Sequence, residues 1–178
     1  MEAIGWIGEG FNKHYDIEYF KLTYENSVDF DKVFKFAFVR NPYDRFASGV
    51  IGHTIQSPIM DEILGLMPPE GIKKMDKERF IAFTLAHKDR FDDLVVLRQQ
   101  HKFINIDGKN MMDFIGRFES LQEDFDELCV KLGFNPTILP HMMKGRYNDY
   151  SHLWTPETRE IVTNYYSKDF EEFKYETI

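Results

Sequence analysis

A mainly apolar run, rich in aromatic side chains and interrupted by Lys35, occupies residues 34–39 and stops at Arg40. A run of this length and composition is typical of a buried strand. Asn41 and Pro42 follow at once: asparagine is a common helix cap, and the fixed backbone angle of proline suits the first helical position. Asp44 then falls in the first turn, where a carboxylate interacts favourably with the helix dipole. The pattern predicts a strand that ends at Arg40 and a helix that begins immediately after it.

The rest of the chain alternates between helical and extended patterns. Helical spacing of apolar residues predicts helices over residues 14–22, 60–66, 76–87, 90–100, 120–132 and from 155 onward. Extended runs predict strands at residues 103–106, before a turn at Asp107-Gly108, and at residues 112–119. The helix signals are a cap at Asp76, a capping box from Ser120 to Glu123, a stop at Gly133, and Thr155 before Pro156. Strands that alternate with helices predict an α/β domain with a small, mainly parallel sheet, flanked by helices and binding its ligand at the strand carboxyl ends.

Length and charge narrow the class of protein. The 178 residues suffice for one domain, which we expect to span residues 1–178. The net charge of −8 argues against nucleic-acid binding, although a few converging arginines can still form a local anion site. The one cysteine, Cys129, excludes an intrachain disulfide, and we expect it to lie in a helix core. The chain has no apolar run long enough to span a membrane and no signal peptide, so we expect a cytoplasmic protein.

The junction at Arg40 combines several groups that bind anions. A helix start offers backbone N–H groups, Arg40 adds a cation, and Ser48 adds a hydroxyl two turns into the helix. Asn41, Arg45 and Ser48 stand at i, i+4 and i+7 and therefore share one face of the helix. The alternative is a structural junction whose arginines pair with surface carboxylates.

Other candidate sites are weaker. The glycine-spaced stretch at residues 4–10 has no lysine followed by serine or threonine and carries Glu9, so it does not match a phosphate loop. His53, His87 and His101 have no partner at metal-ligand spacing, and we predict no metal site.

Three motifs, in order, resemble signatures of the sulfotransferases that use 3′-phosphoadenosine-5′-phosphosulfate (PAPS), most closely the carbohydrate enzymes of Golgi and bacterial type. Residues 40–45, read RNPYDR, together with Ser48 are similar to the motif that binds the 3′-phosphate of PAPS. Residues 115–125 resemble the strand–helix signature of the same families, and residues 166–175 resemble their closing signature. The likeness covers residues ~14 to 175.

The resemblance implies roles for particular residues. Arg40 and Ser48 would bind the 3′-phosphate, and His14, which precedes the arginine motif by a similar interval, would be the general base for the acceptor hydroxyl. Lys144 and Arg146 match the loop that closes over the nucleotide. The implied fold is a P-loop-kinase-like three-layer sandwich, and we expect its first strand to be missing, because residues 1–13 do not match the family's P-K-x-G-T-[ST] loop.

The sequence therefore predicts a sulfotransferase that moves a sulfuryl group from PAPS to a hydroxyl group, with a carbohydrate as acceptor and no metal. Trp6, Tyr43 and Trp154 are the aromatic side chains that could stack on a sugar. One alternative is a truncated or degenerate relative that binds nucleotide or glycan without turnover. A nucleotide kinase is disfavoured because the chain has no G-x-x-x-x-G-K-[ST] motif.

Overall fold

The structure is a computed structural model, and it describes residues 15–56, 76–140 and 150–177. The chain divides into two compact units, each defined by the contacts among its own residues. Unit 1 consists of residues 1–39 and 100–139, and unit 2 of residues 40–99 and 140–178. None of the helices in the described ranges has the length and apolar character needed to cross a membrane.

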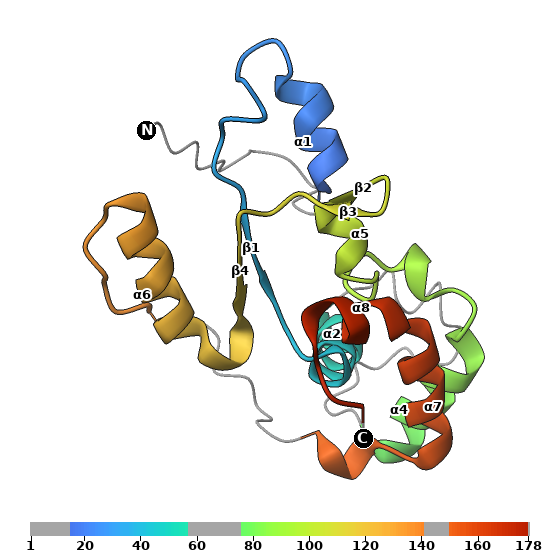
Figure 1. Cartoon of the computed structure of the whole chain (residues 1–178). Helices are drawn as coiled ribbons and strands as arrows, with labels where there is room; N and C mark the ends of the chain where they lie inside the picture. Colours follow the sequence, from blue (N-terminus) through green and yellow to red (C-terminus); the bar gives the residue numbers. More distant parts are fainter. Residues whose placement is uncertain (1–14, 57–75, 141–149, 178) are drawn as a thin grey trace. The chain divides into compact units, whose positions relative to one another are not determined.

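Unit 1 contains the sheet. Strand β1 (Phe36–Val39) pairs in parallel with β4 (Phe114–Arg117), and the two run side by side in Figure 1. Gly116 lies opposite Phe38 in this register, and a Cβ atom at Gly116 would come within 2.4 Å of the Phe38 ring. A side chain at this position would therefore displace the ring. The predicted α/β fold with a small parallel sheet is confirmed.

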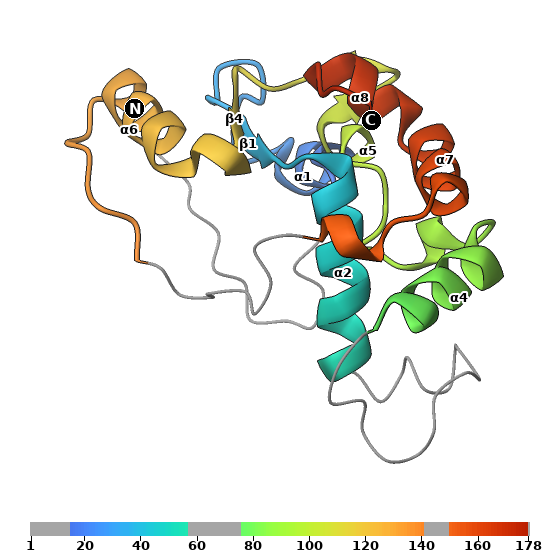
Figure 2. The ribbon, with the colours of Figure 1, turned by 90° about the horizontal axis from the view of Figure 1, so that it is seen from below.

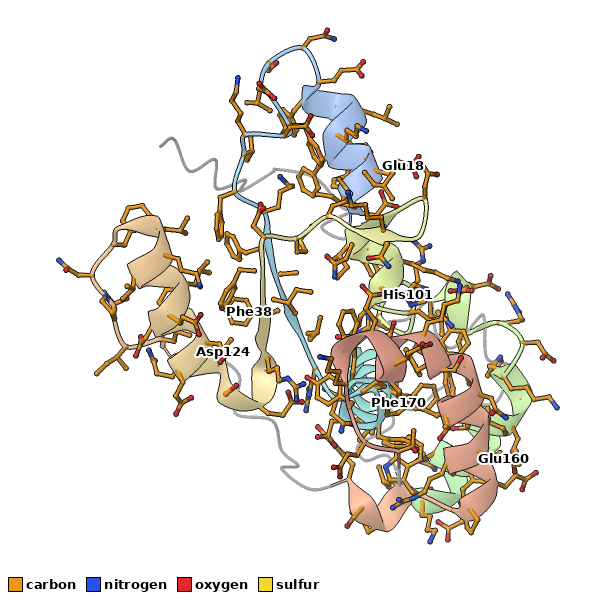
Figure 3. All side chains as sticks on the ribbon, viewed as in Figure 1. Glu18, Phe38, His101, Asp124, Glu160 and Phe170 are labelled. Atoms are coloured by element: carbon orange, nitrogen blue, oxygen red, sulfur yellow. The ribbon has the colours of Figure 1, made fainter. Side chains whose placement is uncertain are left out.

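Helix α6 (Leu121–Leu132) follows β4 through a 3₁₀ turn, η2 (Phe118–Ser120), and packs against the strand. The predicted stop at Gly133 is confirmed, with the glycine in the left-handed region at φ 78°. Cys129 is buried in this helix, as expected. The predicted capping box is wrong. Ser120 closes the 3₁₀ turn with ψ 37°, and its side chain caps nothing. The carboxylate of Asp124, which is labelled in Figure 3, accepts a hydrogen bond of 2.5 Å from the Arg117 N–H.

The remainder of unit 1 comprises α1 (Ile17–Tyr24), α5 (His101–Ile104) and an antiparallel hairpin of β2 (Asn105–Ile106) with β3 (Lys109–Asn110). Asp107 and Gly108 form the predicted turn, both at positive φ, which suits a two-residue hairpin. The strand predicted at residues 103–106 is half wrong. Residues 101–104 form one helical turn because it buries His101 and Ile104 on the same side.

Unit 2 is helical around one aromatic core. Helix α2 (Pro42–Gln56) packs against α7 (Pro156–Tyr165), and α7 packs against α4 (Lys77–His87) and α8 (Ser167–Phe173) (Figure 2). A short 3₁₀ turn, η1 (Phe91–Asp93), follows α4, and a second, η3 (Ser151–Leu153), precedes α7. The predicted caps at Asp76 and Thr155 are both present, and each side chain accepts a hydrogen bond from the N–H three residues later.

The helix predicted over residues 90–100 is wrong. Only η1 is helical there, and Leu94 leaves it in an extended conformation. The chain then turns so that Leu97 is buried, as Phe91 is at the other end, and the Gln99 side chain donates to the carbonyl of Tyr165. A continuous helix would not have buried both Phe91 and Leu97 and also allowed the Gln99 side chain to reach the carbonyl of Tyr165.

The burial of His87 is expected to make the folded protein less stable in mild acid. The side chain is buried, its Nε2 has no hydrogen-bond partner among the described residues, and burial, followed by the charge of Arg90, lowers its pKa below the ordinary 6.5. Between the lowered pKa and 6.5 the unfolded chain binds a proton that the folded chain does not, so the free energy of unfolding falls as pH falls through this range.

Urea unfolding at a series of pH values measures this effect. The His87→Leu variant should lose the contribution of His87 to the pH dependence below 6.5, so its free energy of unfolding should fall less steeply there than that of wild type. Identical pH profiles for wild type and His87→Leu would contradict the assignment.

Candidate functional site

The start of α2 has the conformation that the sequence predicts. The side-chain oxygen of Asn41 accepts a bond of 3.0 Å from the Tyr43 N–H, and its carbonyl accepts one of 2.9 Å from the Arg45 N–H. Pro42 is the first helical residue and Asp44 lies in the first turn. The helix therefore begins with a fixed geometry immediately after Arg40.

Two faces of α2 differ in burial. One face is buried at i, i+3, i+4, i+7 and i+8 and forms part of the core of unit 2; its residues are Tyr43, Phe46, Ala47, Val50 and Ile51. The other face is half-buried at Asn41, Asp44, Arg45 and Ser48, and Arg40, just before the helix, is half-buried as well. The predicted separation of polar and apolar faces is confirmed. Arg40 and Ser48 are thus outside the buried core of unit 2.

Arg45 is part of the packing of unit 2. Its guanidinium lies 3.5 Å from the hydroxyl oxygen of Tyr166 and donates to it, and the Tyr166 hydroxyl in turn donates to the carbonyl of Leu97. Tyr166 has no exposed surface. Arg45 therefore connects α2 to the end of α7 and to the irregular segment before Gln99, a role that helix periodicity alone did not indicate.

Tyr43 and Trp154, two of the aromatic residues considered for sugar stacking, are buried in the core. Their rings lie 5.3 Å apart, and Tyr43 also packs against Phe170, labelled in Figure 3, at 5.0 Å. The Tyr43 hydroxyl bonds to the hydroxyl of Thr163 at 2.6 Å. The two rings are 4% and 8% exposed, so neither offers a face to a sugar.

Several predicted residues lie outside the described part of the chain. These are His14, Lys144 and Arg146, together with Trp6 and the helix predicted at residues 60–66. The second signature does lie in the described part. Its Arg117 and Glu119 are both exposed, at the end of β4 and in η2.

Unit 1 holds an apolar pocket of about 370 Å³ between α1, β1 and α5. Half of its fourteen lining residues are aromatic, and Lys35 is the one charged residue among them. The Lys35 ammonium donates to the carbonyls of Phe30 at 3.1 Å and Val33 at 2.6 Å and lies 3.4 Å from the Asp113 carboxylate. Because its protons are engaged in this way, Lys35 contributes to the fold of unit 1.

Within the described ranges, no three histidine, cysteine, aspartate or glutamate side chains gather in a way that could hold a metal ion. The candidate site there consists of the start of α2 with Arg40 and Ser48.

A family model described as "Sulfotransferase family" matches residues 11–176, which is nearly the whole chain. No curated protein and no solved structure matches the chain.

Proposed function

The chain belongs to the sulfotransferase family, and on this premise we propose that it transfers a sulfuryl group from PAPS to a hydroxyl group of a carbohydrate. In the same proposal, residues 1–178 act as a single domain, no metal takes part, and the protein works in the cytoplasm.

The observation that carries the proposal is the arrangement at the start of α2. Asn41 and Pro42 set the first turn, the buried face fixes the helix in the core, and Arg40 and Ser48 remain half-buried rather than enclosed. A phosphate group at this position would meet a cation, a hydroxyl and the positive end of a helix dipole together.

Each of these groups has a separate role in holding the 3′-phosphate. The planar guanidinium of Arg40 can donate two parallel hydrogen bonds to phosphate oxygens, which gives orientation as well as charge. The Ser48 hydroxyl can donate one more. Because phosphate carries a negative charge at neutral pH, these bonds are charge-assisted and stronger than neutral ones.

The transfer step itself is a displacement at sulfur. The acceptor oxygen forms a bond to sulfur while the bond from sulfur to the 5′-phosphate oxygen breaks, and 3′,5′-bisphosphoadenosine leaves with that electron pair. His14 accepts the proton of the acceptor hydroxyl, since histidine is the side chain that most often serves as a general base at neutral pH. Lys144 and Arg146 would supply positive charge to the nucleotide from the loop that carries them.

Transfer of radiolabelled sulfuryl from PAPS tests this function. The purified chain should label at least one member of a panel of carbohydrates, and the His14→Ala variant should lose at least about 100-fold in rate, the range in which general bases contribute. The panel should also contain phenols and aliphatic alcohols, so that the class of acceptor is tested together with the reaction.

The result also separates transfer from binding alone. Labelling of phenols but not carbohydrates would contradict the proposed carbohydrate acceptor, but it would still support the transfer of a sulfuryl group from PAPS. Binding of 3′,5′-bisphosphoadenosine without labelling of any acceptor would contradict the reaction and favour a family member that binds nucleotide without turnover.

A further inference from the structure

Helix α2 is fixed to the rest of unit 2 at two points on either side of Ser48. The first point is Arg45, three residues before Ser48, which donates to the Tyr166 hydroxyl. The second is Gly49, immediately after Ser48, where a Cβ atom would lie 2.8 Å from the Leu97 side chain and 3.5 Å from the carbonyl oxygen of Val96. The backbone of α2 therefore approaches residues 96–97 very closely beside the serine.

Both points of attachment involve the same irregular segment, the one that contains Leu97. The Tyr166 hydroxyl, which receives the bond from Arg45, donates to the carbonyl of Leu97, and Leu97 is the residue that packs on Gly49. This segment is itself attached to the end of α7, because the Gln99 side chain donates to the carbonyl of Tyr165. Tyr166 and Leu97 are thus bonded to each other, and each also contacts α2 beside Ser48: Tyr166 through Arg45, and Leu97 through Gly49.

The buried environment keeps this connection intact at neutral pH. Tyr166 has no exposed surface, and burial raises the pKa of its hydroxyl above the ordinary 10.0, with the nearby Arg45 acting in the opposite direction. The hydroxyl therefore stays protonated, and it can donate to Leu97 while it accepts from Arg45.

We propose that Tyr166 is a positioning residue for the phosphate site, whose hydroxyl holds α2 through Arg45 and Leu97 so that Ser48 keeps its place relative to Arg40. This inference rests on the proposed function, since it assigns Tyr166 to the site that binds the 3′-phosphate. Tyr166 lies in the core and does not touch the nucleotide; it acts through the helix.

The test is the preference of the protein for a nucleotide with a 3′-phosphate. Calorimetry gives the dissociation constants of 5′-AMP and 3′,5′-bisphosphoadenosine, and their ratio isolates the contribution of the 3′-phosphate. Tyr166→Phe keeps the ring and removes the hydroxyl, and we expect it to lower this ratio about fivefold, as expected for roughly one hydrogen bond. A purely structural role would lower the melting temperature but leave the ratio unchanged at temperatures where the variant is folded.

The neighbouring tyrosine provides a matched control. Tyr165→Phe also removes one hydroxyl, which donates its proton to Asp92 at 2.8 Å near the surface rather than to the Leu97 carbonyl. We expect Tyr165→Phe to leave the ratio as in wild type.

A second variant keeps the test decisive if Tyr166→Phe folds poorly. Arg45→Lys retains the charge but loses the planar guanidinium, and the half-buried position tolerates the change better than the core does. We expect the same fall in the ratio, and in the double variant Tyr166→Phe/Arg45→Lys the two effects should not add, because they break one connection.

The outcomes distinguish this inference from the proposed function. If wild type prefers the 3′-phosphate and Tyr166→Phe or Arg45→Lys keeps that preference, the positioning role is overturned and the proposed function stands. Additive effects in the double variant would likewise overturn it. If wild type shows no preference for the 3′-phosphate, both the proposed function and the positioning role are overturned.

Discussion

Phe46→Ala is expected to destabilise unit 2 by about 3–5 kcal/mol, the usual cost of removing a phenylalanine ring from a core. Phe46 has no exposed surface, and its ring packs against Phe91 at 4.9 Å and Phe80 at 5.8 Å. It also lies within 6.4 Å of the rings of Trp154 and Tyr166. Because these residues come from several separate elements, the cavity would loosen contacts throughout the unit. Urea unfolding followed by tryptophan fluorescence measures the loss through Trp154.

An apolar truncation at the surface of the same unit is the control. Leu85 on α4 is 36% exposed, and Leu85→Ala should cost less than about 1 kcal/mol. Phe46→Leu fills part of the cavity, so its loss of stability should fall between those of Phe46→Ala and Leu85→Ala. Equal losses for Phe46→Ala and Leu85→Ala would show that the ring cluster around Phe46 is not the core of unit 2.

Arg40→Ala is expected to weaken binding of 3′,5′-bisphosphoadenosine by at least about 30-fold. Removing one partner of a hydrogen-bonded charge pair costs about 2–5 kcal/mol, and each 1.4 kcal/mol corresponds to a tenfold change in the dissociation constant. Arg40→Lys keeps the charge without the planar fork and should give an intermediate loss. Ser48→Ala, which removes one hydroxyl, should cost less than Arg40→Ala. Calorimetry with the bisphosphate measures all three variants.

The matched control is an arginine in the same unit with no proposed contact to the nucleotide. Arg79 on α4 has an exposed side chain that pairs with Asp76 at 3.7 Å, and Arg79→Ala changes the net charge by the same amount as Arg40→Ala. We expect it to leave the affinity within about twofold, because exposed charges at a distance are screened by salt. Equal losses for the two variants would attribute the effect to net charge and would remove Arg40 from the proposed site.

The features that sequence reasoning predicted correctly are those that neighbouring residues determine. Asn41 and Pro42 set the start of α2, Asp76 and Thr155 cap their helices, and Gly133 ends α6 because a glycine accepts the left-handed conformation easily. The strand at β1 also followed from the composition of a short run. That residues 1–178 act as one domain stays a prediction.

The features that sequence reasoning missed depend on distant contacts. Residues 90–100 have a pattern compatible with a helix, but Phe91 and Leu97 are both buried in the core of unit 2, and the chain turns to place them there. Ser120 and Glu123 have the spacing of a capping box, yet the 3₁₀ turn before α6 puts Ser120 outside the conformation that capping requires. In both places, tertiary packing overrides a local signal.

The same distinction applies to the site. The separation of the two faces of α2 was predictable because helix periodicity determines it. The connection from Arg45 to Tyr166 was not, since these residues are far apart in sequence and no pattern in either segment points to the other. Tyr166 was visible only as part of the closing signature. The roles of Arg40, Ser48, His14, Lys144 and Arg146 stay predictions.

The start of α2 is proposed to bind the 3′-phosphate of the nucleotide, and calorimetry on the wild-type protein with two nucleotides tests this. The protein is titrated with 3′,5′-bisphosphoadenosine and, under identical conditions, with 5′-AMP, which lacks the 3′-phosphate. We expect the bisphosphate to bind at least about tenfold more tightly, since a phosphate held by charge-assisted hydrogen bonds contributes more than 1.4 kcal/mol. Equal affinities for the two nucleotides, or no binding of either, would contradict it.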